Sequence, residues 1–152
     1  MSKLNLVWVG VIVFSLTGLF YLFNTAYSNP SGLPDYAFTK PNIREAYEFA
    51  KSNYDDLLNL PCNCGCMTPE GAKAHGSRVH ALGLADCFTN GDVNNGGKWD
   101  SHASACGLCY EDALLAKKSY LEGKSKSEVA QVLEAKYSTQ TVSNNTVYGG
   151  KK

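Results

Sequence analysis

The sequence predicts a mainly α-helical protein, in which a small helical domain with a cysteine-rich loop follows an N-terminal transmembrane helix. Three observations support this fold class. The run from Leu4 to Phe23 contains no charged residue. Later segments repeat apolar residues at helical spacing. Five of the six cysteines fall in two tight clusters, and a chain of 152 residues has room for one modest core beside a membrane segment.

The apolar run Leu4–Phe23 is long enough to cross a bilayer core of about 30 Å as a helix. Lys3 precedes the run and the next cation is Lys40, which favours a single-pass anchor at the cell membrane with the C-terminal domain extracytoplasmic. A cleaved signal peptide is the alternative to a signal-anchor, because residues 26–28 resemble a small-x-small cleavage site. We assign residues 1–24 to the anchor or signal peptide.

Residues 25–40 contain two prolines and a glycine and few core residues, so they are expected to form an extended linker. The cysteine-rich helical domain then covers residues 41–137. Its first helix begins near residues 39–41, because proline, here Pro41, is favoured in the first turn. A break at residues 52–53 divides this helix in two, and the second part leads into the proline at position 61. The first cysteine cluster therefore lies on a loop that leaves a helix end.

Residues 81–88 are expected to form a short helical or extended piece. The next helix is predicted from about residue 100 to 122, with Gly123 as its C-terminal cap. Residues 125–128 read Ser-Lys-Ser-Glu, which fits a capping box that opens a last helix. The polar tail, residues 138–152, is predicted to be disordered.

The charge pattern excludes some functions. Fourteen basic residues balance fourteen acidic ones, so the chain has no basic field of the kind that holds nucleic acid. The adjacent carboxylates Asp55-Asp56 and Glu111-Asp112 are typical of solvated helix faces and do not indicate acid–base catalysis. We expect a protein that is not an enzyme, with a redox role for the thiols left open.

The first cysteine cluster is Cys62-x-Cys64-x-Cys66. Cysteines two residues apart do not easily reach each other with relaxed disulfide geometry. Crowded thiolates also repel one another unless a cation or other cysteines neutralise them. The spacing therefore indicates a bound soft metal ion or bonds to cysteines elsewhere in the chain.

The second cluster is His102-x-x-x-Cys106-x-x-Cys109. On one helix these positions share a face, so we predict a stripe with one imidazole and two sulfurs. The loop of the first cluster is expected to lie across this stripe, with Cys87 completing the pocket. The predicted metal ligands are Cys62, Cys64, Cys66, Cys87, His102, Cys106 and Cys109.

His75, His80 and Met67 are given ordinary packing or surface roles, and His80→Ala is not expected to abolish metal binding. No catalytic residue is assigned.

Three interpretations of the cysteines stay open. Thiolate-rich sites select Cu(I), zinc and iron–sulfur clusters, and six sulfurs exceed the four ligands of one zinc ion. More than one ion, or one ion and a disulfide, would use the surplus. A domain stapled by three disulfides, without metal, is the second interpretation. A thiol–disulfide oxidoreductase is the third, although neither cluster has a cation beside it.

The segment Pro61-Cys62-Asn63-Cys64-Gly65-Cys66 resembles the signature of the bacterial PCYCGC-motif family of extracytoplasmic proteins, with Asn63 where the motif has tyrosine. Asp86-Cys87-Phe88 and the segment from Trp99 to Cys109 are similar to further features of that family. The resemblance covers about residues 41–137. Many members are lipoproteins, and this chain lacks the lipid-anchoring cysteine. The resemblance implies the cysteine and histidine constellation and a location outside the cytoplasm, and it implies no reaction.

The expected function is that of a membrane-tethered, extracytoplasmic soft-metal-binding protein. Copper as Cu(I) is the expected metal, with zinc as the alternative. Copper handling would mean either delivery or sequestration of excess ions. The expected partners are the membrane and a copper-dependent membrane oxidase or metal transporter.

Overall fold

The computed structural model describes residues 13–19 and 31–136. The chain divides into two units, Met1–Gly32 and Leu33–Lys152, which we treat separately. Residues 13–19 of the first unit are helical. Among the described residues, no helix combines the length and apolar character needed to cross a bilayer.

Most of the predicted anchor, residues 1–24, lies outside the described residues, and so does the tail at residues 138–152.

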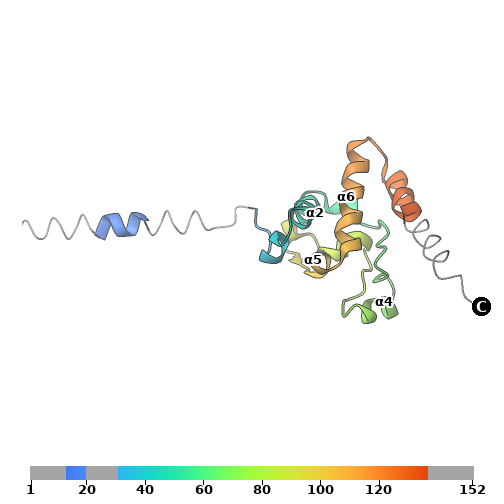
Figure 1. The fold of residues 1–152 in the computed structure, drawn as a ribbon, viewed down its shortest axis with the longest axis horizontal. Helices are drawn as coiled ribbons and strands as arrows, with labels where there is room; N and C mark the ends of the chain where they lie inside the picture. Colours follow the sequence, from blue (N-terminus) through green and yellow to red (C-terminus); the bar gives the residue numbers. More distant parts are fainter. Residues whose placement is uncertain (1–12, 20–30, 137–152) are drawn as a thin grey trace, which may run out of the picture. The chain divides into compact units, whose positions relative to one another are not determined.

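The second unit is mainly helical, as predicted, and carries one short two-stranded ribbon (Figure 1). Helix α6 is the longest of its named elements, and α2 packs against it. The elements, in order, are η1 (Asp35–Phe38), α2 (Pro41–Ser52), α3 (Tyr54–Leu57), α4 (Pro69–Ala74), η2 (Gly83–Cys87), β1 (Thr89–Asn90), η3 (Val93–Asn95), β2 (Lys98–Trp99), α5 (His102–Ala105) and α6 (Gly107–Leu121), followed by a helix at residues 126–136. In the antiparallel ribbon Thr89 pairs with Trp99.

Helix α2 provides the core on which the rest of the domain is assembled. Pro41 occupies the first turn, as predicted, and the apolar face of the helix is buried. Tyr47 is fully buried, and its ring lies 5.0 Å from that of Phe88 and 5.7 Å from that of Trp99. The Tyr47 hydroxyl donates to the Asp100 carbonyl oxygen at 2.7 Å. One side chain of α2 thus fixes the backbone just after Cys87 and just before His102.

The break after α2 occurs where it was predicted, at Asn53. The second helix, α3, ends at Leu57 instead of continuing to the proline. The chain then runs beside η2, where the Leu84 N–H donates to the Leu60 carbonyl at 2.9 Å. Gly83 adopts φ 78°, and a Cβ placed there would lie 2.3 Å from the Leu60 oxygen. This close approach holds the start of the cysteine loop against η2, the short helix that ends at Cys87.

The predicted helix at residues 100–122 is wrong in one respect, because it is divided into α5 and α6. Cys106 is extended, with φ −108° and ψ 108°. The Asp100 carboxylate accepts from the His102 N–H at 2.9 Å and starts α5, and the chain opens again after a single turn. Gly107, which costs more entropy to hold in a helix than other residues, follows the break. The predicted single stripe of ligands on one helix therefore does not exist.

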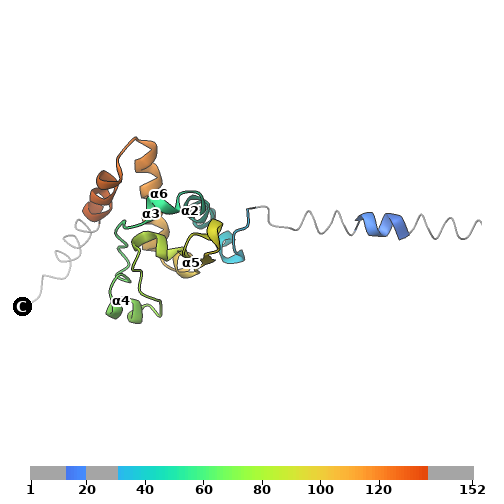
Figure 2. The same ribbon diagram turned by 180° about the vertical axis from the view of Figure 1, so that it is seen from behind.

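Both caps predicted after α6 are confirmed. Gly123 adopts φ 82°, and the Lys124 N–H donates to the Ser119 carbonyl at 3.1 Å, as in a Schellman cap. The Ser125 N–H donates to the Glu128 carboxylate at 2.8 Å, which is the capping-box contact. The turn between these caps brings the helix at residues 126–136 back beside α6 (Figure 2).

Gly83→Ala should destabilise the domain by about 2–5 kcal/mol, because a left-handed non-glycine residue and an overpacked contact both cost free energy. Gly76→Ala is the matched control. Gly76 also has a positive φ, 61°, but has no atom within 4 Å of an added Cβ. Its loss should be limited to about 1–2 kcal/mol. Urea unfolding of the reduced protein measures both values, and equal losses would contradict the packing of Gly83 against Leu60.

Candidate metal centre

Six cysteines and two histidines converge in one continuous cluster. They form three groups of four, and within each group the candidate ligand atoms all lie within 4.8 Å of one another. All seven residues predicted from the sequence belong to these groups, and His80 is the addition. The groups are Cys62, Cys64, His80 and Cys87; Cys64, Cys66, His80 and His102; and Cys64, His102, Cys106 and Cys109. Each can hold a metal ion.

The cysteine loop turns all three of its thiols inward. Cys62, Cys64 and Cys66 are buried, and the Cys62 sulfur lies 2.8 Å from that of Cys64 and 2.9 Å from that of Cys87. Gly65 adopts φ 84°, a left-handed conformation that glycine takes without steric cost. In the described part of the chain all six cysteines are free thiols. The alternation of cysteines with other residues thus places all three sulfurs of the loop on its buried side.

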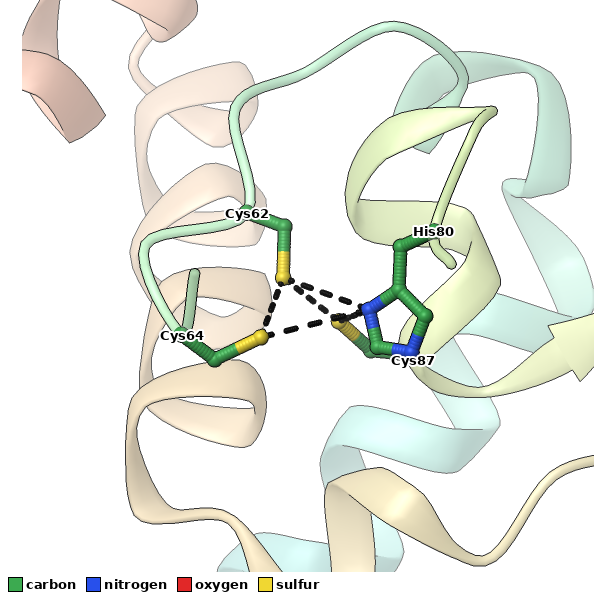
Figure 3. A group of neighbouring side chains, drawn as sticks. All are labelled: Cys62, Cys64, His80 and Cys87. Atoms are coloured by element: carbon green, nitrogen blue, oxygen red, sulfur yellow. Dashed lines mark hydrogen bonds between the residues drawn. The ribbon is translucent and has the colours of Figure 1, made fainter. Parts of the chain in front are cut away.

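His80 is a ligand candidate that no pattern in the sequence indicates. Figure 3 shows its Nδ1 facing three sulfurs, at 3.3 Å from Cys87, 3.6 Å from Cys62 and 3.9 Å from Cys64. Its Nε2 lies 3.1 Å from the Ser77 hydroxyl. A hydrogen bond on the far ring nitrogen is how proteins orient a metal-binding imidazole. The assignment of His80 to an ordinary role therefore does not fit its position.

His80 is positioned by a tertiary contact and not by a repeat in the sequence. Its backbone N–H donates to the Cys66 carbonyl at 2.8 Å, which ties it to the cysteine loop. The seven-residue separation from Cys87 leads through a turn and a 3-10 helix, so no helix or strand repeat relates the two. His75, by contrast, is exposed, with its ring 6.3 Å from that of His102.

The residues of the second cluster lie on both sides of the break at Cys106, which separates α5 from α6. Cys106 occupies the N-cap position of α6 and Cys109 lies in the first turn of the helix. The His102 Nε2 lies 3.7 Å from the Cys66 sulfur, which joins this cluster to the cysteine loop. The N-terminus of a helix carries partial positive charge, which favours thiolates near it. The N-terminal end of α6 therefore supplies two sulfurs to the cluster.

Arg78 links the three segments that carry His80, Cys87 and His102. Its guanidinium forms ion pairs with Asp86 at 3.2 Å and Asp100 at 3.1 Å. It also donates to the backbone carbonyls of Asp86 and Thr89. The Asp86 side chain is almost fully buried, whereas that of Arg78 is about one-third exposed. One cation thus joins the segment of His80 to Asp86, the residue before Cys87, and to Asp100, two residues before His102.

Asn63, which replaces the tyrosine of the family motif, anchors the loop from its outer side. Its amide donates to Asp112 of α6 at 2.8 Å and to the Leu133 carbonyl at 3.2 Å. Burial raises the pKa of Asp112, and this is opposed by Lys136, whose ammonium lies 3.2 Å from the carboxylate. Asn63 therefore connects the cysteine loop to α6 and to the last helix through hydrogen bonds.

The thiols titrate unequally because they share one space. Hydrogen bonds from Cys106 and Cys109 lower the pKa of Cys64, and a bond from Cys109 lowers that of Cys62 to about 6. Burial raises the pKa of Cys66 to about 12 and raises that of Cys87. The metal-free cluster therefore holds some thiolates next to thiols that keep their protons at neutral pH.

His80 shows the same charge coupling. Burial acts to lower its pKa, but hydrogen bonds to Cys62 and Cys64 outweigh burial and raise the pKa to about 9. Without metal the imidazole is a cation that balances thiolate charge. A metal ion would replace that proton and those on the thiols, because metal ligands must be deprotonated.

Arg78→Ala should cost about 3 kcal/mol of stability, because it leaves the buried Asp86 carboxylate without its partner; the partial exposure of Arg78 places the loss at the lower end of the usual range. Arg44→Ala is the control, since the Arg44–Glu48 pair lies on an exposed helix face and contributes about 0.5 kcal/mol or less. Chemical denaturation under reducing conditions gives both values. Equal losses would show that Arg78 does not organise the site.

Metal affinity should rise with pH. Cys66 and Cys87 have raised pKa values, so they are protonated below those values and a metal ion must displace the protons. Each displaced proton weakens apparent binding by up to about tenfold per pH unit lowered. Competition with a chelator at pH 6, 7 and 8 measures this dependence. A dissociation constant that stays the same across this range would contradict the protonated starting state.

Of three comparisons with known proteins, one gives a match, and it is to the family of the cysteine motif. A search of the curated proteins and a search of the solved structures give no match. A family model described as a protein of unknown function with PCYCGC motif matches residues 25–146, which is most of the chain. The chain belongs to the PCYCGC-motif family.

Proposed function

We propose that this protein binds Cu(I) outside the cytoplasm, tethered to the membrane, and handles copper by delivery or sequestration. The observation that supports the proposal is the convergence of six sulfurs and two imidazoles in one largely buried cluster. Soft thiolates prefer Cu(I) to the hard cations that carboxylates bind. Within the described residues, the three ligand groups contain no carboxylate.

The surroundings of the cluster suit retention of a soft ion. Most of the sulfurs are buried beside apolar side chains such as Leu84 and Phe88, which exclude water and competing hard ligands. His102 and Cys106 are only half-buried and line a surface pocket together with His75. An ion in the cluster would therefore have one accessible side for transfer to a partner, either a copper-dependent membrane oxidase or a metal transporter.

The proposed role is binding rather than catalysis. Zinc is the alternative ion, because two of the groups offer three cysteines and one histidine, a ligand set that structural zinc sites use. The close approach of the Cys62 sulfur to the Cys87 sulfur, at 2.9 Å, keeps a disulfide-bonded domain without metal as the second candidate function.

The direct test uses the full chain in detergent, reduced and handled without oxygen. Cu(I) is titrated against a chromogenic Cu(I) chelator, and free thiols are counted before and after loading. We expect Cu(I) to be retained against the chelator and the thiols to be protected from alkylation when it is bound. Protein that binds neither copper nor zinc and has no free thiols in its native state would contradict the proposal and favour the disulfide-bonded domain.

His80→Ala should weaken Cu(I) binding by at least about 10-fold, because loss of even an outer-shell partner costs 10–100-fold. His75→Ala is the matched control, since His75 lies beside His102 but in none of the ligand groups, and its affinity should change little. The same chelator competition measures both variants. Equal affinities for wild type and His80→Ala would remove His80 from the site.

A further inference from the structure

Two of the three ligand groups have only one residue in common, and we call them the inner set and the outer set. The inner set consists of Cys62, Cys64, His80 and Cys87, and the outer set of Cys64, His102, Cys106 and Cys109. Each set has three sulfurs and one imidazole nitrogen, and only Cys64 belongs to both. The cysteine loop between α3 and α4 supplies Cys62 and the shared Cys64, and η2 with the loop before it completes the inner set. The rest of the outer set comes from α5, α6 and the N-cap residue between them.

One metal ion cannot use this cluster completely. A tetrahedral ion takes four ligands at about 2.0–2.3 Å, and the two sets contain seven different residues. Within a set all ligand atoms lie within 4.8 Å of one another, a spacing that suits a shared ion at the centre. The arrangement thus offers two ion positions, one in each set.

We propose that Cys64 bridges two metal ions, one in the inner set and one in the outer set, so that the cluster is binuclear. This inference rests on the proposed metal-binding function. Cys64 is the only cysteine found in all three ligand groups. A thiolate has several lone pairs and binds two soft cations at once. Cys66 belongs to the middle group, in which its sulfur lies within 4.8 Å of the ligand atoms of Cys64, His80 and His102.

A second cation also accounts for the crowding at Cys64. Its sulfur lies near those of Cys62, Cys106 and Cys109, and several thiolates in one buried space repel one another. One monovalent ion would leave most of that charge unbalanced in a medium of low dielectric constant. Two Cu(I) ions, one on either side of Cys64, would offset two of these negative charges, whereas one ion offsets one.

The two positions differ in access to solvent. All four residues of the inner set are buried. In the outer set, His102 and Cys106 are half-buried and line the surface pocket beside His75 and Glu111. The outer ion is therefore the one that exchanges with solution, and the inner ion is retained.

The test combines native mass spectrometry of the Cu(I)-loaded full chain with ¹¹³Cd NMR of the cadmium-loaded chain. We expect two ions per chain and two ¹¹³Cd resonances that are coupled to each other, because scalar coupling passes through a bridging sulfur. Cys87→Ser should remove the inner ion, and Cys109→Ser the outer one, so each variant retains one ion. Cys64→Ser should weaken both positions and abolish the coupling.

The time course of removal by a Cu(I) chelator tests the difference in access. Two phases are expected for the wild type, and the fast phase should be missing in Cys109→Ser. Circular dichroism of each loaded variant checks that it is folded, and the wild-type NMR spectrum tests the bridge without any substitution.

Several results would overturn the bridge. A single tightly bound ion, or two uncoupled ¹¹³Cd resonances, would leave the proposed function intact and remove the shared Cys64. A Cys64→Ser variant that loses only one ion and retains the other unchanged would do the same. A single removal phase would contradict the difference in access. Failure to bind Cu(I) or cadmium at all, with oxidised thiols, would overturn both the bridge and the proposed function.

Discussion

The constraint on which the structure depends is the packing of six thiols and two imidazoles, most of them buried, in one small space. Such groups repel one another when they are ionised and are costly to bury without partners. In the metal-free chain the cost is reduced by proton sharing, since Cys64 takes thiolate character while Cys66 and Cys87 keep their protons. A soft cation would replace those protons and convert a crowded cluster into a set of bonds. The fold holds the ligands close together before a cation binds.

A few long-range polar contacts on an apolar base hold the ligands close together. Tyr47 of α2 holds the Asp100 carbonyl, and Arg78 joins Asp86 and Asp100. Asn63 fastens the cysteine loop to Asp112. Each contact involves a residue one or two positions from a candidate ligand. It therefore restricts the movement of the backbone that carries that ligand. Every buried side-chain nitrogen and oxygen in the described part of the chain has a partner, which fits a site built for fixed geometry.

The sequence was sufficient for the parts of the fold that local chemistry controls. Proline at the first turn, the break at Asn53, and the caps at Gly123 and Ser125 each depend on neighbours a few residues away. It also predicted the convergence of both cysteine clusters and Cys87. It failed where tertiary contacts decide. The break at Cys106 interrupts a good helical pattern, and His80 reaches the sulfurs through a bond to the Cys66 carbonyl that no spacing reveals.

The central claim is that sulfur and imidazole from this cluster bind Cu(I) directly. X-ray absorption at the copper edge of the reduced, Cu(I)-loaded full chain measures this most directly. The predicted spectrum has a first shell dominated by sulfur at about 2.3 Å with a minor nitrogen contribution near 2.0 Å, taking the distances of zinc as a guide. The nitrogen contribution should decrease in His80→Ala. A first shell of oxygen and nitrogen alone would contradict the account.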